Sequence, residues 1–538
     1  MYVYLAPAVR PCLDKRNPLR YEGKIHPSSC EGSKMSQAIL KSFEPLFYPR
    51  SLAIIGASAD PRKYGNIILS AIMEMGYKGP IYPVNPDGGE INGLPVSRSL
   101  EEIKREVDLA ILTIPASFVA PALEGCLRKK IKGVEIISSG FKETGTFEGK
   151  RMEEEIARMS QGRIRILGPN CFGIYCPESR LTILPGYNFS KETGPVGFLS
   201  QSGGLCADFG QMAKGLGIRF SKMVSYGNGC DVDECDLLEY FFADEKTRII
   251  AGYLEGVKDG SRLMKILGKN KGEKPVLLWK AGLTATGRRA AMSHTGSISG
   301  DGPIWTAALK QVGVIQVCSA EELIDAIYAF LYLSTPIGPS VALLGGGGAI
   351  GVAASDLLER LGLAVPAFSP PILEKLRSTF PSVGNSLRNP VDLGNPMIPP
   401  SLLQRAMEAA GEDPNVDTLM IIQILYYILF QSRHRLKMED RPLQNFSFQP
   451  ELLRACQQIK GKYRKPIILI FPDITTDRPM IDLESEWRRE RDSYQTAGFP
   501  VFRSLERAAR ALRHFLAYQN LKDPGKPPTR NNPAEQKD

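Results

Sequence analysis

Short runs of β-branched and other apolar residues alternate with helical patterns from about residue 50 onward, and this alternation limits the fold more than any other feature. The runs SLAIIGA, IYPVN, LAILTIP, GVEIISS and IRILGPN have the length of buried strands, and helix-like segments separate several of them. Parallel strands need helical crossovers on the faces of their sheet. The pattern therefore predicts a doubly wound parallel sheet in an α/β protein.

Two further series of the same kind follow. The second contains VGFLSQSGG, FSKMVSYGN, IIAGYLEGV and PVLLWKAG, and we interpret it as an α/β domain of the flavodoxin-like type. The third starts at VALLGGGGAIG, adds strands in TLMIIQILYY and KPIILIFPD, and ends in the helical pattern ERAARALRHFLAYQ. A chain of 538 residues is too long for a single core, so several α/β domains with parallel sheets are expected.

The two ends of the chain have no such pattern. We expect residues 1–40 to be a disordered or mis-assigned leader, with Met35 a plausible true start that N-terminal sequencing would test. The last residues are polar and contain proline, so they cannot bury a core. The expected division after the leader is a first domain at 41–178, a second at 179–335, a third at 336–520 and a polar tail at 521–538.

Composition restricts the class of protein. The chain carries 67 basic and 58 acidic residues, a net charge of +9, and no long block of one sign. A phosphate-rich ligand, an ordinary solvated surface or weak nucleic-acid contact all fit, and nucleic acid fits least well. The ten cysteines form no CxxC pair, and the longest apolar run, LMIIQILYYILF, is too short to span a membrane and contains Gln423. No signal peptide is evident and no metal ligand set is expected, so we predict a cytoplasmic enzyme.

Glycine-rich turns follow several of the predicted strands. In IIGASADPRKYGN the turn contains Gly56 and Gly65 and does not match the GxGxxG fingerprint of NAD-binding domains. The strand in YPVNP also ends without an acidic residue. A helix that starts after such a turn presents free backbone N–H groups to a phosphate. The alternative interpretation is an ordinary turn of an α/β fold.

SQSGGL and GGGGAIG each open a predicted helix in a different domain. The helix dipole favours an anion at that end, and glycine allows a close approach of the backbone. Two such turns could hold one phosphoryl group from opposite sides, and the alternative is two ordinary tight turns. The candidate phosphate-binding residues are Ser200, Gln201, Ser202, Gly203, Gly204, Gly345, Gly346, Gly347 and Gly348.

His294 is one of only four histidines and lies in AAMSHTGSISGDG, a stretch of small residues, hydroxyls and glycines. A neutral imidazole is a competent nucleophile toward phosphorus, and the glycines predict a mobile tether. Glu255, at the end of the strand in YLEGV, could orient the imidazole through a hydrogen bond. The alternatives are a surface histidine and an ordinary carboxylate at a strand end.

Ten short strings occur along the chain in this order: IIGAS, YPVNP, TIPASFV, SSGFKE, LGPNCFG, FLSQSGG, SYGNGCDVDECDLLEYF, YLEGV, SHTGS and NPVDLGNP. Through them the chain resembles the α subunits of NDP-forming acyl-CoA synthetases, especially the ADP-forming acetyl-CoA synthetases, over about residues 45–510. The resemblance implies a Rossmann-like CoA-binding domain followed by two flavodoxin-like domains of the succinyl-CoA synthetase type. GGGGAIG departs from the more usual asparagine-containing turn, and Gln431–Glu451 has no evident counterpart.

The resemblance implies an acid–thiol ligase that interconverts acyl-CoA, ADP and phosphate with carboxylic acid, ATP and CoA. His294 would carry the phosphoryl group and Glu255 would steady it. No segment resembles a nucleotide-binding ATP-grasp domain, so a separate β subunit is expected to bind Mg-ADP or Mg-ATP in a hetero-oligomer. The residues matching CoA-contacting loops are Gly56, Ala57, Ser58, Asn85, Pro86, Ile114, Pro115, Asn170 and Cys171.

Two other functions compete with this one. A CoA- or acyl-CoA-binding module that has lost catalysis would need neither His294 nor Glu255 nor the two glycine turns. An NAD-linked oxidoreductase fits the fold class alone and lacks the fingerprint.

Overall fold

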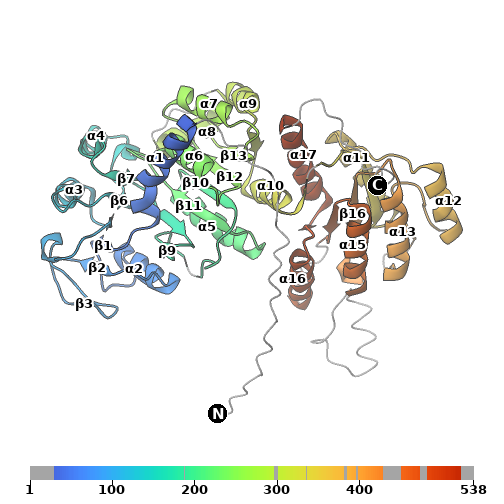
Figure 1. Cartoon of the computed structure of the whole chain (residues 1–538), viewed down its shortest axis with the longest axis horizontal. Helices are drawn as coiled ribbons and strands as arrows, with labels where there is room; N and C mark the ends of the chain where they lie inside the picture. The colour runs from blue at the N-terminus through green and yellow to red at the C-terminus, as the bar shows by residue number, and fades with distance from the viewer. Residues whose placement is uncertain are drawn as a thin grey trace, which may run out of the picture.

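The computed structural model describes residues 30–186, 188–295, 301–334, 336–380, 384–394, 398–427, 450–472 and 481–522. They form an α/β protein in which each of three parallel sheets is flanked by helices, as the alternating pattern predicts. Figure 1 shows two lobes: the first and second units make up one lobe, the third unit makes up the other, and helices α10 and α17 lie between them.

The first unit is a five-stranded parallel sheet in the order β2-β1-β5-β6-β7. The strand order reverses direction between β1 and β5, and in open α/β sheets ligands bind in the crevice at such a point. Its elements are β1(Leu52–Ile55), α2(Tyr64–Met75), β2(Ile81–Val84), β3(Glu90–Ile91), β4(Leu94–Pro95), η1(Leu100–Glu102), β5(Leu109–Leu112), η2(Ala116–Phe118), α3(Val119–Arg128), β6(Gly133–Ile136), η3(Lys142–Thr144), α4(Phe147–Ser160) and β7(Arg165–Leu167).

The second unit contains the seven-stranded sheet β14-β13-β12-β10-β11-β8-β9. Strands β14 to β11 are parallel, and their order in the sheet reverses between β10 and β12. Strands β8 and β9 are antiparallel additions. Strand β8 lies within residues that we assigned to the first domain, so this sheet begins before the expected boundary at 178. The elements are β8(Gly173–Cys176), β9(Leu181–Thr182), β10(Val196–Ser200), α5(Gly203–Gly215), β11(Phe220–Ser225), α6(Glu234–Ala243), β12(Ile249–Leu254), α7(Gly260–Lys269), β13(Val276–Lys280), α8(Ala285–Thr295), α9(Gly302–Gln311), β14(Ile315–Val317) and α10(Ala320–Tyr332).

The third unit contains the parallel sheet β15-β16-β17-β18. A single parallel bridge between Ser340 and Ala364 takes the place that β2 has beside β1 and β11 has beside β10. All three units therefore share one strand order. The elements are β15(Val341–Gly345), α11(Gly348–Arg360), α12(Pro370–Thr379), α13(Pro400–Glu412), β16(Thr418–Ile422), α15(Pro450–Tyr463), β17(Ile467–Ile470), α16(Ile481–Thr496), β18(Val501–Phe502) and α17(Leu505–Lys522).

Helix α1 spans Cys30–Phe47, so residues 30–40 are helical rather than disordered, and a mis-assigned leader stays a prediction. The helix is held by its C-terminal half, where Phe43 and Phe47 are buried and both rings contact Tyr240 of α6. The apolar positions are concentrated in the last turns, which is why the earlier turns show no periodicity in the sequence.

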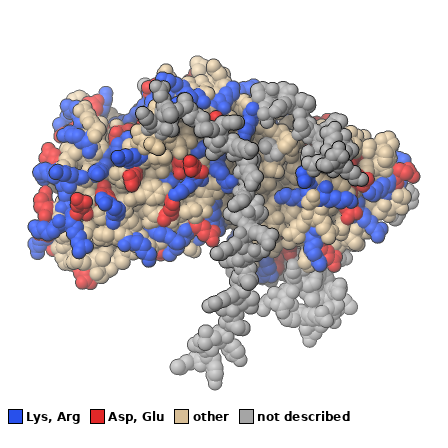
Figure 2. All heavy atoms as spheres, viewed as in Figure 1, with Lys and Arg blue, Asp and Glu red and all other residues tan. Residues whose placement is uncertain are grey.

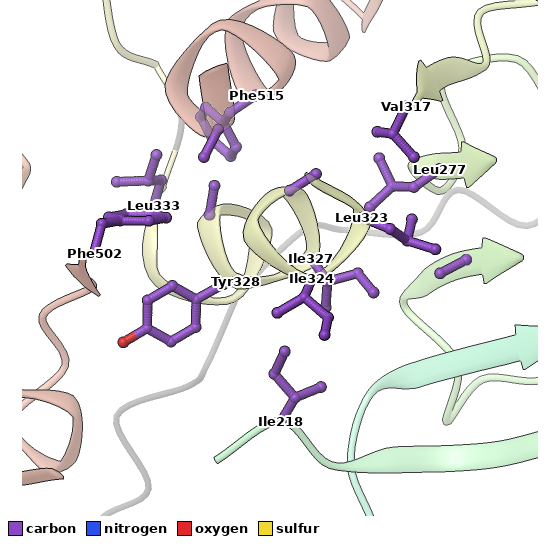
Figure 3. Packing of buried hydrophobic residues seen from close by; sticks show 14 of the residues in the cluster. Ile218, Leu277, Val317, Leu323, Ile324, Ile327, Tyr328, Leu333, Phe502 and Phe515 are labelled. Carbon is purple, nitrogen blue, oxygen red and sulfur yellow. The ribbon is translucent and has the colours of Figure 1, made fainter. Parts of the chain in front are cut away.

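Helix α10 joins the second and third units through a continuous apolar core (Figure 3). Its Leu323, Ile324 and Ile327 face residues of the second unit, and Tyr328 lies beside Phe502 of the third. Arg507 of α17 also forms a two-pronged ion pair with Asp325 of α10, at 2.7 and 2.9 Å. The third unit is therefore packed on the second rather than connected to it only by a linker.

The surface carries charges of both signs. Figure 2 shows lysine and arginine interspersed with aspartate and glutamate over the visible face of both lobes. This agrees with an ordinary solvated surface as the source of the positive net charge. In the part of the chain that the structure describes, no helix is both long and apolar enough to cross a lipid bilayer.

Candidate functional site

The switch point of the first sheet, called the first crevice below, includes the turn after β1. Gly56 has a φ of +93°, and a Cβ there would lie 2.8 Å from Cγ2 of Ile114, so only glycine fits. The side chain of Asn85 donates a hydrogen bond to the carbonyl of Ala57 at 2.8 Å, and Asn66 donates to the carbonyl of Ser58 at 2.8 Å. The candidate CoA-contacting loops after β1, β2 and β5 therefore meet at the switch point of this sheet.

The turn after β7 connects the first unit to the second. The backbone N–H of Asn228, which follows β11, donates to the carbonyl of Pro169 at 2.9 Å. Asn170 has a φ of +57° and its side chain donates to that of Asn228 at 3.4 Å. Cys171 is 2 % exposed, burial raises the pKa of its thiol, and the thiol donates to the carbonyl of Ile136. Its side chain therefore lies in the core, and only the backbone at Cys171 is left to line a pocket.

Phe172, which the sequence analysis did not single out, separates two of the candidate turns. Its ring centroid lies 6.0 Å from that of Tyr64, at the start of α2 in the first crevice. The same ring also packs against the start of α5, because a Cβ added to Gly203 would lie 2.7 Å from Cγ of Phe172. One aromatic ring thus spans the distance between the first crevice and the start of α5. Its signal was its position inside the LGPNCFG string.

The turn between β10 and α5 is internally hydrogen bonded. The hydroxyl of Ser200 donates to the carbonyl of Ser202 at 2.7 Å and accepts from its N–H at 3.1 Å. The Ser202 hydroxyl caps α5 by accepting from the N–H of Leu205 at 3.3 Å. Ser200 is fully buried and shapes the turn, whereas Gly204 is exposed. The helix start is therefore held by its own hydrogen bonds and is open toward solvent at Gly204.

Gln201 connects this turn to Glu255. Its side-chain oxygen accepts hydrogen bonds from the backbone N–H groups of Glu255 and Gly256, the latter at 2.9 Å. The Glu255 carboxylate is 5 % exposed and accepts from the hydroxyl of Tyr253 at 3.1 Å. The structure therefore brings Gln201 and Glu255 together at the second switch point, with Gln201 orienting the end of β12.

His294 lies in the last turn of α8, and its side chain and residues 296–300 are outside the described residues. The expectation of a loop is wrong as far as Thr295, because ATGRRAAM is rich in good helix formers. Helix α8 packs against η3 of the first unit, which follows β6. The helix that carries His294 therefore lies beside the carboxyl edge of the first sheet.

The turn after β15 uses three successive glycines, Gly345, Gly346 and Gly347, whose φ angles are +91°, +81° and +84°. A Cβ added to Gly348 would lie 3.1 Å from a carboxylate oxygen of Asp392. Among the described residues, no hydrogen bond joins this turn to the turn before α5. Nor do those residues contain a cluster of three or more histidine, cysteine or acidic side chains placed to hold a metal ion.

Comparisons with known proteins agree with this architecture. The family described as a CoA binding domain matches residues 50–177, and the family described as a succinyl-CoA ligase like flavodoxin domain matches residues 193–330. These matches fall on the first and second units. The chain is therefore a CoA-binding protein of the succinyl-CoA ligase type, with Rossmann-like and flavodoxin-like units.

Similarity to curated proteins identifies the family more closely. The α subunit of acetate–CoA ligase (ADP-forming) I from Pyrococcus furiosus is 42% identical over 360 residues, covering 65% of this chain and 76% of the relative. The α subunit of isoenzyme II from the same organism is 38% identical, covering 70% and 82%. The acetate–CoA ligase (ADP-forming) I of Archaeoglobus fulgidus is 38% identical, and the match covers 54% of its length. The chain belongs to this family, the NDP-forming acyl-CoA synthetases.

Solved structures show the same arrangement over most of the chain. Acetyl-coenzyme A synthetase 1 of Ca. Korarchaeum cryptofilum, in complex with phosphate and ADP, is 28% identical with a TM-score of 0.72, covering 89% of this chain and 97% of that one. The protein PH0766 from Pyrococcus horikoshii OT3 is 29% identical with the same TM-score, covering 89% and 100%. The likeness therefore includes the third unit, beyond the two matched families.

Proposed function

We propose that the chain is the CoA-binding, phosphohistidine-carrying α subunit of an ADP-forming acyl-CoA synthetase. It interconverts acyl-CoA, ADP and phosphate with carboxylic acid, ATP and CoA. The observation that carries the proposal is the junction of the first two units. There, one ring of Phe172 lies between the CoA crevice and the turn before α5, and Gln201 connects that turn to Glu255.

The first chemical step takes place where the two units meet. A phosphate oxygen attacks the acyl carbonyl carbon, the carbon–sulfur bond breaks, and CoA leaves as the thiol, giving an acyl phosphate. The N–H groups at the start of α5 stabilise the phosphate, because they carry the positive end of the helix dipole. The loops at Gly56, Asn85 and Ile114 hold the CoA, with the turn at Asn170 near its thiol end.

The second step moves the phosphoryl group to the protein. An imidazole nitrogen of His294 attacks phosphorus and the carboxylic acid leaves as its carboxylate. Glu255 accepts a hydrogen bond from the other imidazole nitrogen and stabilises the cationic phosphohistidine. The phosphoryl group then passes to the β-phosphate of ADP, which forms ATP and restores the free histidine.

The nucleotide step requires a partner. We propose an ATP-grasp β subunit that binds Mg-ADP or Mg-ATP, which makes the working enzyme a hetero-oligomer. Two of the relatives are named as α subunits, and the match covers 54% of the length of the Archaeoglobus fulgidus relative, which supports a partner for this chain. The third unit, with the same strand order as the second, would be the second succinyl-CoA-ligase-type domain and present Gly345–Gly348 as a second anion site.

The eight cysteines whose side chains the structure describes are all free thiols, which supports a place in the reducing cytoplasm.

The decisive experiment combines the chain with its β subunit, magnesium and ATP labelled in the γ-phosphate. We expect label on the α chain at His294, loss of label and turnover in His294→Asn, and full labelling in the control His434→Asn. Label at another residue, or turnover in His294→Asn, would contradict the mechanism. Tight CoA binding without any phosphorylation would favour a binding module instead.

A further inference from the structure

Lys280 is a buried lysine beside Glu255 that no step above uses. It ends β13 and is 2 % exposed. Its ammonium donates one hydrogen bond to the backbone carbonyl of Glu255 at 2.7 Å and another to the carbonyl of Ala281. It also lies 5.0 Å from the ring centroid of Trp305 on α9. A lysine ammonium has three donors, and two of them are used on the backbone here.

These contacts fall at the base of the segment that carries His294. The chain leaves β13 through Ala281, whose N–H donates to the carbonyl of Leu254 at 2.9 Å. It returns at Gly302, where a Cβ would lie 2.5 Å from the carbonyl oxygen of Leu283. The two ends of this segment therefore meet, and Lys280 contacts the strand of Glu255, the outgoing end and the helix that follows the return.

We infer that Lys280 is a positioning residue for phosphoryl transfer, which holds the end of β12 and both ends of the His294 segment in one geometry. The inference rests on the proposed function, because it assigns Lys280 a role in the same transfer. Lysine suits this place because one long side chain can reach two carbonyls while its charge faces an aromatic ring. An apolar side chain of similar length, such as methionine, would remove both hydrogen bonds.

The protonated form of Lys280 makes these contacts. Burial lowers the pKa of Lys280 to about 8, and the charge of Glu255 partly opposes that shift. Among the described residues, Glu255 on β12 is the charged group acting on Lys280, and α9 presents the uncharged ring of Trp305. The positioning contacts should therefore weaken as the pH rises through about 8.

Lys274 provides a matched control two residues before the start of the same strand, β13. Its ammonium also donates to two backbone carbonyls, those of Phe241 and Asp244, both at 2.8 Å. Burial lowers its pKa to about 8 as well. Both lysines thus resemble each other in chemistry, and only Lys280 lies beside Glu255.

The test compares Lys280→Met and Lys274→Met in the complete complex with the β subunit. We expect Lys280→Met to lower the single-turnover rate of His294 phosphorylation by about 10- to 100-fold, as loss of an orienting partner does, with the KM for CoA unchanged. Lys274→Met should lower the melting temperature to a similar extent and leave the rate unchanged. Equal rates in wild type and Lys280→Met, or equal rate losses in both variants, would overturn the inference.

A second readout is the pH profile of the same rate. The wild-type rate should fall above pH 8, and Lys280→Arg should keep most of the rate while moving this decline to higher pH, because arginine remains charged. An unchanged alkaline limb in Lys280→Arg would refute the role of the ammonium. If the wild-type chain is not labelled at His294 at all, the proposed function fails rather than the role of Lys280.

Discussion

The second and third units share a strand order and a strand–glycine turn–helix motif, yet they differ in what surrounds the turn. In the second unit, the strand next to the turn ends in the buried carboxylate of Glu255, with Lys280 beside it. In the third unit, the corresponding strand β16 is followed by a buried neutral amide, Gln423. The same fold thus provides two glycine-opened helix starts that we propose as anion sites, and the buried Glu255 and Lys280 distinguish the second unit from the third at this strand end.

The largest effect on turnover is expected from removing the charge of Glu255, which distinguishes the second unit from the third. Glu255→Gln keeps the shape of the side chain and removes its charge, so the second unit comes to resemble the third. We expect turnover to fall by about 10²- to 10⁴-fold, the range associated with a positioned acid or base. The measurement is kcat of the complete complex with labelling of His294, and Gln423→Ala is the control in the third unit. Wild-type turnover in Glu255→Gln would show that the difference between Glu255 and Gln423 does not matter for catalysis.

The next effect concerns the residue that connects the turn to Glu255. Gln201→Leu leaves the N–H groups of Glu255 and Gly256 without their acceptor, which should cost about 1–3 kcal/mol in the free energy of unfolding. Gln201→Glu keeps an acceptor oxygen at the same place, and at a pH where the new carboxyl is protonated, so that it does not repel the buried Glu255, it should retain most of that stability. Denaturant unfolding of both variants tests this, and equal losses in the two would mean that the acceptor oxygen is not what matters.

The two glycine turns should also respond differently to alanine. Gly345 has a φ of +91° and a Cβ would lie 2.4 Å from the carbonyl oxygen of Ile422, so Gly345→Ala should destabilise by about 1–3 kcal/mol or more. Gly204 is open, so Gly204→Ala should be neutral or stabilising by up to about 1 kcal/mol. Thermal and denaturant unfolding distinguish the two variants. A large loss of stability in Gly204→Ala would mean that the turn of the second unit is as constrained as the turn of the third unit.

The smallest effect concerns the contact between the two units. The hydrogen bond with His514 of α17 lowers the pKa of Glu322 on α10 below its usual value of 4.5. A depressed carboxyl pKa adds stability above pH 4.5, and this contribution is lost as the pH falls through the lower folded value. Unfolding measured between pH 7 and pH 3 should show a smaller acid-induced loss in Glu322→Gln than in wild type. Equal losses would exclude this pair as a source of acid sensitivity.

The strands and glycine turns could be predicted because they depend on local patterns. Buried parallel strands appear as apolar runs, and Gly56 and Gly345 are required by backbone conformations that other residues rarely adopt. The alternation predicts three parallel α/β sheets, which the structure confirms except for the antiparallel strands β8 and β9 of the second sheet. Helix α1 and the helical start of the His294 stretch were missed, because neither shows a clear apolar period.

The relations between segments far apart in the chain could not be predicted from the residues alone. Phe172 between Tyr64 and Gly203, and Lys280 between Glu255 and Trp305, depend on how separate elements pack. Nothing local to Phe172 or Lys280 signals these contacts. The burial of the Cys171 side chain is decided in the same way, by the strands that surround it.

The amino-acid order by itself determined the element types, the strand order class and the chemical inventory: a histidine among glycines, a strand-end glutamate and two glycine-opened helices. Only the tertiary structure decided which of these meet. It joined Gln201 to Glu255, enclosed the Lys280 ammonium beside them and set the third unit against α10. The physical reason is that backbone conformation is governed by neighbours in sequence, whereas the burial, orientation and pKa of a side chain are governed by neighbours in space.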